Sequence, residues 1–168
     1  RMSHVMVVDD DQTLLKFFKI HLNKFFSKVV VVKSAKEAVE TLKEKEIDLI
    51  LTDIRMPKVD GIQLLKKIRA YDASIPVFML SGGALTAEQI KTVDESSDGF
   101  LKKPFTIDEI QEFIELGMRK RELLKQLSEL VPDNKKLLAI LKGKAKLTSS
   151  MPSDSRAAAS ELLVQLAG

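Results

Sequence analysis

Residues 48–69 read DLILTDIRMPKVDGIQLLKKIR, a short apolar run followed by a segment of helical periodicity. The run LILT is almost continuously apolar, which is typical of strands that are buried on both faces of a sheet. Beyond it, Ile62, Leu65 and Ile68 are three residues apart and lie on one face of a helix. The stretch therefore predicts a buried strand that leads into an amphipathic helix.

The same alternation extends over the first 116 residues. Leu15, Phe18 and Leu22 recur at spacings of three and four, which predicts a helix between the first two apolar runs. Strands that alternate with helices in this way indicate an α/β fold, a parallel sheet with helices on both faces. The five predicted strands are residues 4–8, 29–32, 48–52, 76–80 and 99–102, with a helix in each interval and a fifth helix after the last strand.

Composition excludes several classes of protein. Apolar residues make up 45% of the 168, enough to bury a core. The absence of cysteine excludes a disulfide scaffold, a thiolate metal site and a cysteine nucleophile, and two histidines are too few for a histidine-rich metal site. No apolar run approaches the length of a membrane span, and the N-terminal residues lack a signal-peptide pattern. We therefore expect a soluble, cytoplasmic protein.

The net charge of +3 is unevenly distributed along the chain. Residues 1–116 carry a net charge of −2, whereas residues 117–150 carry +6, with nine Lys or Arg against three Asp or Glu. Such an excess is most often a solvated helix face. The alternative is a surface for an anionic partner.

Polar side chains come directly after four of the predicted strands. In open parallel sheets, ligands bind at the carboxyl ends of the strands, so these side chains are the candidates for function. They come from separate parts of the chain, and the topology brings them to one edge of the sheet. They are Asp9, Asp10 and Asp11 after the first strand, Asp53 after the third, Ser81 after the fourth and Lys103 after the fifth.

Asp9, Asp10 and Asp53 would bring three carboxylates together. Two unit charges about 4 Å apart repel by roughly 4 kcal/mol at an effective dielectric constant near 20, so such a cluster needs protons or a cation. Oxygen ligands favour Mg²⁺ or Mn²⁺ over zinc. Lys103 offers a positive charge and Ser81 a hydroxyl group to a phosphoryl oxygen. The set predicts phosphoryl transfer to a carboxylate, which gives an aspartyl phosphate.

Each of these residues alone has a simpler interpretation. Asp11 directly precedes a predicted helix, the usual position of an N-cap. Asp53 alone would be a turn residue, and Lys103 alone a surface lysine. Their joint occurrence at strand ends favours a site. His21, by contrast, is predicted to be a packing or surface residue on the first helix rather than a metal ligand.

Four stretches of the chain carry a specific resemblance: VMVVDDDQTLL, DLILTDIRMPKVDGIQLLKKIR, IPVFMLSGG and DGFLKKPF. They resemble the signature stretches of the receiver domain of two-component response regulators. The resemblance covers residues 4 to about 118. It implies the flavodoxin-like fold with strand order 2-1-3-4-5. It also implies a function, acceptance of a phosphoryl group from a histidine kinase or phosphotransfer protein and a consequent switch in partner binding or dimerisation.

The resemblance implies roles for individual residues around the acidic cluster. Asp9 and Asp10 match the family's acidic pair, with Asp10 the direct metal ligand. Asp53 matches the phosphorylated aspartate, and the backbone carbonyl of Arg55 matches the third protein ligand of the metal. In this family the residues at the positions of Arg55 and Gly83 influence the lifetime of the phosphoryl group.

The resemblance also identifies the residues expected to report phosphorylation. Ser81 matches the switch hydroxyl and Phe100 the switch aromatic residue. Lys103 matches the invariant lysine, and its bond to Pro104 matches a cis peptide in the family, which X–Pro bonds allow at low cost. Such a protein is not an enzyme acting on other substrates; it catalyses only its own phosphorylation and dephosphorylation.

Two other functions compete with this interpretation. Asp9, Asp11 and Thr13 fit the Asp-x-Asp-x-Thr motif of haloacid-dehalogenase-type phosphatases, in which Asp9 would be the nucleophile. That class needs a further acidic pair after its lysine, and the chain offers only Asp108 and Glu109 there. A phosphorylation-independent adaptor is the other alternative, and the intact site argues against it.

The fifth predicted helix continues beyond the receiver, to about residue 130. Leu123, Leu127 and Leu130 follow one another in a heptad-like row that includes Lys120. Since nothing in the receiver is expected to cover this row, it predicts a seam for a homodimer, weakened by the lysine. The alternative is that the row folds back on Leu137, Leu138 and Leu141 of the same chain.

The sequence thus predicts three parts. Residues 1–118 form the receiver, residues 119–148 a basic helical extension that continues the fifth helix, and residues 149–168 a linker with a short terminal helix. We find no winged-helix or helix-turn-helix pattern, so no DNA-binding domain is readable.

Overall fold

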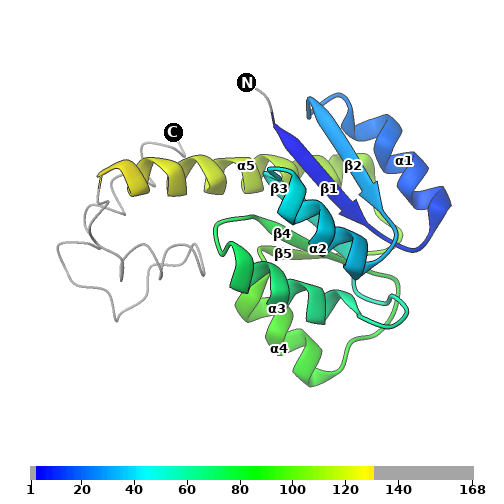
Figure 1. Cartoon of the computed structure of the whole chain (residues 1–168). Coiled ribbons are helices and arrows are strands. Elements are labelled where there is room, and N and C mark those ends of the chain that lie inside the picture. Colours follow the sequence, from blue (N-terminus) through cyan, green and yellow to red (C-terminus); the bar gives the residue numbers. More distant parts are fainter. Residues whose placement is uncertain (1–2, 131–168) are drawn as a thin grey trace.

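In the computed structural model, which describes residues 3–130, five strands form one parallel sheet (Figure 1). The strands are β1 (His4–Val8), β2 (Lys28–Val32), β3 (Leu49–Asp53), β4 (Val77–Ser81) and β5 (Gly99–Lys102). The helices are α1 (Gln12–Leu22), α2 (Ala35–Glu44), α3 (Gly61–Tyr71), α4 (Ala87–Ser96) and α5 (Ile107–Leu130). The strand order is β2-β1-β3-β4-β5, so the predicted flavodoxin-like topology is confirmed.

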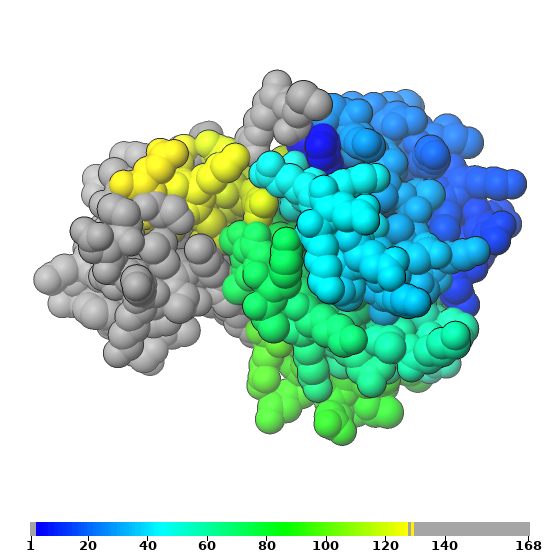
Figure 2. Space-filling model, in the orientation of Figure 1, coloured from blue at the N-terminus to red at the C-terminus, as the bar shows by residue number. Residues whose placement is uncertain are grey.

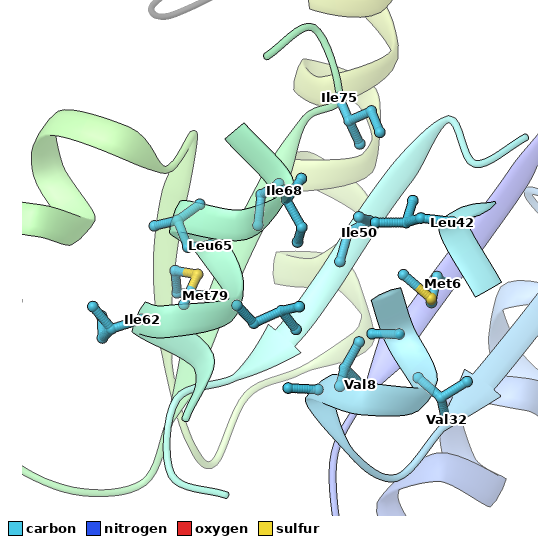
Figure 3. Close-up of a cluster of buried hydrophobic side chains, with 14 of the residues drawn as sticks. Met6, Val8, Val32, Leu42, Ile50, Ile62, Leu65, Ile68, Ile75 and Met79 are labelled. Atoms are coloured by element: carbon cyan, nitrogen blue, oxygen red, sulfur yellow. The ribbon is translucent and has the colours of Figure 1, made fainter. Parts of the chain in front are cut away.

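Two apolar clusters cover the two faces of the sheet, because successive residues of a strand point to opposite sides. Met6 and Val8 pack with residues of α2, α3 and α4 (Figure 3). Val5 and Val7 pack with residues of α1 and α5 on the other face. Figure 2 shows α2, in cyan, covering part of the surface that faces the viewer. The central strands are therefore buried on both faces, as their continuous apolar runs predict.

The strands β3 and β4 extend one residue further than predicted, which places two site residues within the sheet. Asp53 pairs with Leu80, and Ser81 pairs with Lys102, in the parallel ladder. The backbone carbonyl of Ser81 also accepts a hydrogen bond from the amide of Lys103 at 2.8 Å. The two side chains therefore stand at a fixed edge of the sheet rather than on a loop.

Helix N-caps fix the chain on either side of this edge. The Asp11 carboxylate accepts hydrogen bonds from the amides of Thr13 and Leu14, so its prediction as the N-cap of α1 is confirmed. Asp60 and Gln63 form a reciprocal capping box at the start of α3. These caps set where α1 and α3 begin, directly after the segments that carry Asp9, Asp10 and Asp53.

Helix α5 is continuous from Ile107 to Leu130, which confirms the predicted length. Contrary to the expectation, the start of its second half does contact the receiver, because Lys120 and Arg121 form ion pairs with Asp98 and Asp48. Leu123 and Leu127 are 6% and 2% exposed, and Lys120 forms an ion pair with Asp98 at the start of β5. The side chain of Leu130 lies outside the described residues.

Other predictions fall outside the described residues as well. They concern the remainder of the extension to residue 148, the fold-back partners Leu137, Leu138 and Leu141, and the linker with its terminal helix over residues 149–168. Among the helices of residues 3–130, none is long and apolar enough to cross a membrane.

Candidate functional site

Three carboxylates meet at the carboxyl ends of β1 and β3, as the topology predicts. Asp9 and Asp53 are buried, 1% and 5% exposed, and Asp10 is exposed to solvent. One oxygen of each carboxylate lies within 4.8 Å of the other two. The donors are all oxygen atoms, the ligands that Mg²⁺ prefers.

A single lysine faces the two buried carboxylates. The Nζ atom of Lys103 lies 2.9 Å from Oδ2 of Asp9 and 3.1 Å from Oδ1 of Asp53. Burial alone would lower the pKa of Lys103, but its hydrogen bond to Asp9 and the charge of Asp53 outweigh burial and raise it. Lys103 is therefore a firmly charged ammonium between the two buried carboxylates.

The electrostatic environment of Asp53 disfavours its charge in the absence of a cation. Burial raises the pKa of the Asp53 carboxyl, and the negative charge of Asp9 raises it further. The Lys103 ammonium lowers it without cancelling these effects. A divalent cation beside Asp53 would supply the missing positive charge and favour the ionised carboxylate, which is the nucleophilic form.

Ser81, the last residue of β4, lies fully buried at the same edge. Its Oγ atom accepts a hydrogen bond from the amide of Gly83 at 3.3 Å and lies 3.4 Å from the carbonyl oxygen of Gly83. These two contacts are long, so they hold the hydroxyl group weakly. The bond between Lys103 and Pro104 is cis, as the resemblance implies.

Phe100 lies on β5 at some distance along the ladder from Ser81. Its partner across the ladder is Met79, whereas Ser81 pairs with Lys102. Because Phe100 and Lys102 are two residues apart, Phe100 shares the α4-facing side of the sheet with Ser81. Phe100 is exposed and lines a groove of about 740 Å³ between α4 and β5. The structure therefore places the two predicted switch residues on one face of the sheet, at different positions of the β4–β5 ladder.

The side chain of Arg55 occupies a position that the sequence did not indicate. Its Nη2 atom donates a hydrogen bond to the carbonyl oxygen of Ala84 at 2.6 Å. A Cβ atom added at Gly83 would lie 2.6 Å from Cζ of Arg55, so the guanidinium group rests directly against Gly83 and would have to move to admit a larger residue. The loop after β4 is thus held between Ser81 on one side and Arg55 on the other.

Gly61 is a second residue whose importance emerges only from the structure. A Cβ atom there would lie 2.1 Å from the carbonyl oxygen of Asp53, so α3 begins in direct contact with the backbone of the acceptor residue. The amide of Gly61 donates to the carbonyl oxygen of Ile54 at 2.7 Å. The glycine directly after the Asp60 cap was visible in the sequence, but nothing there showed which backbone it approaches.

The geometry does not favour the phosphatase interpretation. The Asp11 carboxylate accepts hydrogen bonds from the first amides of α1 and serves as its cap. Glu109 exchanges hydrogen bonds with Thr106 at the start of α5, and Asp108 is exposed in the same turn. The residues that this class of enzyme would need are thus occupied as helix caps or face solvent.

Comparison with known protein families gives a match over most of the described chain. The sequence model of the response regulator receiver domain matches residues 5–115. The chain belongs to the response regulator receiver family. The receiver fold, the acidic edge and the lysine opposite Asp53 therefore occur together in a family of signalling proteins.

Relatives of this receiver include transcriptional regulators. The chain is 25% identical to the alkaline phosphatase synthesis transcriptional regulatory protein PhoP of Bacillus subtilis over 77% of its own length and 54% of that protein. It is 32% identical to the probable transcriptional regulator ycf29 of Porphyra purpurea, over 77% of this chain and 65% of the relative. The chain spans only about half to two thirds of the length of these relatives.

Solved structures agree with the assignment. The receiver domain of the Francisella response regulator 1452 is 32% identical and superimposes with a TM-score of 0.62. The match covers 70% of this chain and 98% of the Francisella domain. The similarity is therefore to a whole receiver domain, and the second half of α5 continues beyond the residues matched by the family model.

Proposed function

We propose that this receiver accepts a phosphoryl group on Asp53 and thereby switches the surface that it offers to partners. The donor would be a cognate histidine kinase or phosphotransfer protein, and a cytoplasmic location is part of the proposal. The observation that carries it is the position of Lys103, whose ammonium group contacts both Asp9 and Asp53 at the carboxyl edge of the sheet. One lysine facing two buried carboxylates, with a third carboxylate beside them, leaves an excess of negative charge that a divalent cation would neutralise.

In the proposed step, an ionised Oδ atom of Asp53 forms a bond to phosphorus while the bond from phosphorus to the donor breaks. With a phosphohistidine donor, the leaving imidazole nitrogen takes up a proton from water; with acetyl phosphate, acetate leaves. Mg²⁺ would be held by Asp9, Asp10, Asp53 and the backbone carbonyl of Arg55, and it would neutralise negative charge on the phosphoryl oxygens.

The other residues of the site would stabilise and report the product. Lys103 would move its hydrogen bonds from Asp53 to a phosphoryl oxygen, since an ammonium group with three donors can turn without losing Asp9. The Ser81 hydroxyl, held only by long contacts to Gly83, would reorient to donate to the same phosphoryl group. Movement of the loop after β4 would then alter the groove that Phe100 lines.

Labelling with a small phosphodonor tests the proposal. Incubation with Mg²⁺ and acetyl phosphate should add one acid-stable, base-labile phosphoryl group, detected by intact mass and located by peptide mapping. Asp53→Ala should abolish labelling and Asp9→Ala should weaken it. Asp108→Ala, a matched control at an exposed aspartate, should leave labelling unchanged.

The same variants separate the competing functions. Loss of labelling in Asp9→Ala with retention in Asp53→Ala would establish the phosphatase chemistry, and Asp108→Ala should then impair turnover. No labelling of the wild-type protein, also after mixing with phosphorylated histidine kinases, would favour a phosphorylation-independent adaptor. A homodimer through Leu123, Leu127 and Leu130 is a further proposal, and it requires that Leu123 and Leu127 become uncovered.

A further inference from the structure

Helix α5 lies very close to the sheet at Gly117, near the amino-terminal ends of β3 and β4. A Cβ atom at Gly117 would lie 2.7 Å from Cδ1 of Leu49 and 2.8 Å from Cε2 of Phe78. Leu49 begins β3, and Phe78 is the second residue of β4. Only a glycine allows the helix to lie this near to the sheet, and the next turn of α5 therefore reaches the loops at this edge.

The first of these contacts is an ion pair between Lys120 and Asp98. Lys120 is only 7% exposed, and its Nζ atom donates to Oδ1 of Asp98. Burial lowers the pKa of Lys120, and the charge of Asp98 partly restores it. A lysine at this depth depends on its carboxylate partner, because an unpaired buried charge is strongly destabilising.

Asp98 joins the ends of several elements at one point. Its Oδ2 atom accepts hydrogen bonds from Nη2 of Arg69 and from the amide of Val77, both at 2.8 Å. Arg69, in the last turn of α3, also donates to the carbonyl oxygen of Ser96 at the end of α4. The carboxylate of Asp98 thus connects α5 with α3, the start of β4 and, through Arg69, with α4.

A second group of contacts lies beside it. Arg121 has its Nε atom 3.7 Å from Oδ1 of Asp48 and its Nη1 atom 3.6 Å from Oδ2 of Asp72. The same Nη1 atom donates to Oγ of Ser74 at 2.8 Å. We refer to Lys120 and Arg121, with Asp98, Asp48 and Asp72, as the ionic clasp. It fixes the direction in which the second half of α5 leaves the receiver.

Strand β5 connects this clasp to the acidic site at the other edge of the sheet. Asp98 directly precedes β5, and Lys103 directly follows it. Lys103 holds Asp9 and Asp53 at the carboxyl end of the strand, while Asp98 holds Lys120 at the amino end. The strand has only four residues, and its ladder with β4 is in register from Gly99 to Lys102. The four residues of β5 are therefore the shortest connection along the chain between Lys103 and Asp98.

We propose that the ionic clasp passes the state of the acidic site to the second half of α5, with Lys120 as the positioning residue. The proposal rests on the proposed phosphorylation of Asp53 for its trigger. In this proposal, formation of the phosphoryl contacts of Lys103 is accompanied by a small shift of β5, and Asp98 then shares its hydrogen bonds differently between Arg69 and Lys120. The second half of α5, which bears Leu123 and Leu127, then changes its hold on the receiver.

Hydrogen–deuterium exchange of the amides at residues 119–127, measured on the full chain, tests the clasp itself. Lys120→Ala leaves Asp98 paired with Arg69, so the receiver should stay folded while these amides exchange at least tenfold faster. Lys120→Arg should restore protection, because it keeps a cation in reach of Asp98. Lys125→Ala, at an exposed lysine further along α5, should behave like the wild type. Unchanged protection in Lys120→Ala would overturn the proposal.

Two further experiments test whether a change at the acidic site reaches the ionic clasp. Lys103→Met removes the contacts of Lys103 with Asp9 and Asp53 in the absence of a phosphoryl group. It should change the hydrogen–deuterium exchange rate of the amides at residues 119–127. In a protein that already carries Lys120→Ala, the same substitution should have no further effect on these amides. Phosphorylation with acetyl phosphate and Mg²⁺ should also change the exchange rate of these amides. The fraction of Asp53 that is phosphorylated is measured by mass spectrometry in the same sample. Phosphorylated wild type with unchanged exchange at these amides would overturn transmission. Absence of phosphorylation would instead refute the proposed function, and Lys103→Met would then decide the inference alone.

Discussion

The Nζ atom of Lys103 lies 3.1 Å from an oxygen of Asp53, close enough to share its charge with a carboxylate that is also within reach of Asp9. The same lysine donates to Asp9 at 2.9 Å. One positive charge thus faces two buried negative charges, and the exposed Asp10 adds a third. This imbalance would favour a bound cation, and a cation beside Asp53 would favour its ionised form.

Replacement of the acceptor residue should change the pH dependence of stability. The pKa of Asp53 is raised by burial and by the charge of Asp9, so its contribution to stability is full below its ordinary value of 3.8 and is lost as the pH rises through the raised pKa. Asp53→Asn should therefore leave the free energy of unfolding nearly unchanged at low pH and increase it at neutral pH without Mg²⁺. Urea denaturation at a series of pH values measures the free energy of unfolding of both proteins. Mg²⁺ should reduce the difference in this free energy between Asp53→Asn and the wild type at neutral pH.

Asp72 provides a control of opposite sign. Burial alone would raise the pKa of Asp72, but hydrogen bonds from Ser74 and the charge of Arg121 outweigh it and lower the pKa. Its contribution to stability is therefore present above its ordinary value and is lost as the pH falls through the lowered pKa. Asp72→Asn should therefore lower the free energy of unfolding at neutral pH. If Asp53→Asn and Asp72→Asn changed this free energy equally, the opposite pKa shifts of Asp53 and Asp72 would both be contradicted.

The exposed carboxylate of Asp10 should determine the Mg²⁺ concentration that phosphorylation requires. Asp10→Asn removes one charged ligand from the proposed cation site without disturbing the buried pair. The Mg²⁺ concentration for half-maximal phosphorylation by acetyl phosphate should rise by roughly tenfold or more. Mg²⁺ should also raise the melting temperature of the wild type more than that of the variant, since it binds the folded state. The same Mg²⁺ demand and the same thermal shift in both proteins would exclude Asp10 as a ligand.

Arg55 and Gly83 should act as one unit on the phosphoryl group. Gly83→Ala places a methyl group 2.6 Å from Cζ of Arg55, and the flexible guanidinium group would move off the carbonyl oxygen of Ala84. The folded state should lose less than about 1 kcal/mol, because the displaced group is at the end of an exposed side chain. The half-life of the phosphoryl group on Asp53 should change in the same direction in Gly83→Ala and Arg55→Ala.

A double-mutant cycle decides whether the two residues are coupled. The Gly83→Ala/Arg55→Ala double variant should show no larger change in half-life than either single variant. Additive effects would mean that the methyl group acts on the loop directly and not through Arg55.

Gly61→Ala should be severely destabilising. The added methyl group would lie 2.1 Å from the backbone oxygen of Asp53 and 2.8 Å from Cα of Ile54, and backbone atoms cannot move aside as a side chain can. We expect a loss of about 3 kcal/mol or more in the free energy of unfolding, at the upper end of overpacking effects. Gly82→Ala is the matched control, because its nearest neighbour would be the Lys103 side chain at an ordinary 3.8 Å. Equal midpoints of urea denaturation for the two variants would contradict this account.

The leucine row of α5 should respond to phosphorylation in sedimentation experiments. Leu123 and Leu127 are buried, so the unphosphorylated protein should be a monomer at high micromolar concentration. A phosphoryl mimic should shift it toward a dimer, and Leu123→Asp with Leu127→Asp should prevent the shift while leaving phosphorylation intact. Ile20→Asp, at an exposed position on α1, is the control. If the wild type stayed monomeric with and without the phosphoryl mimic, the proposed dimer seam of Leu123, Leu127 and Leu130 would be refuted.

Much of this architecture could be predicted from sequence, because its signals are local. The apolar runs predict the five strands to within one residue, and the rule that strand ends share an edge predicts that Asp9, Asp10, Asp53 and Lys103 lie together. The contacts that sequence reasoning missed depend on where one element lies against another. Arg55 over Gly83 and Gly61 against Asp53 are contacts between segments whose relative placement no spacing reveals.

The second half of α5 shows the same limit more clearly. Lys120 interrupts a row of leucines, and by periodicity alone it is a weak point in a dimer seam. In the structure Lys120 is a buried cation that forms an ion pair with Asp98, more than twenty residues earlier in the chain. Its partner could not be inferred because the direction of α5 across the sheet depends on the close contact at Gly117.

The acidic site and the ionic clasp lie at opposite ends of the same short strands. A protein that delivers a phosphoryl group to Asp53 must approach the carboxyl edge, whereas a protein that grips the second half of α5 approaches the amino edge. If Asp53 is phosphorylated as proposed, the donor and a target of α5 would therefore use different edges of the sheet. Phosphorylation of Asp53 would then not require a target to leave the second half of α5 first.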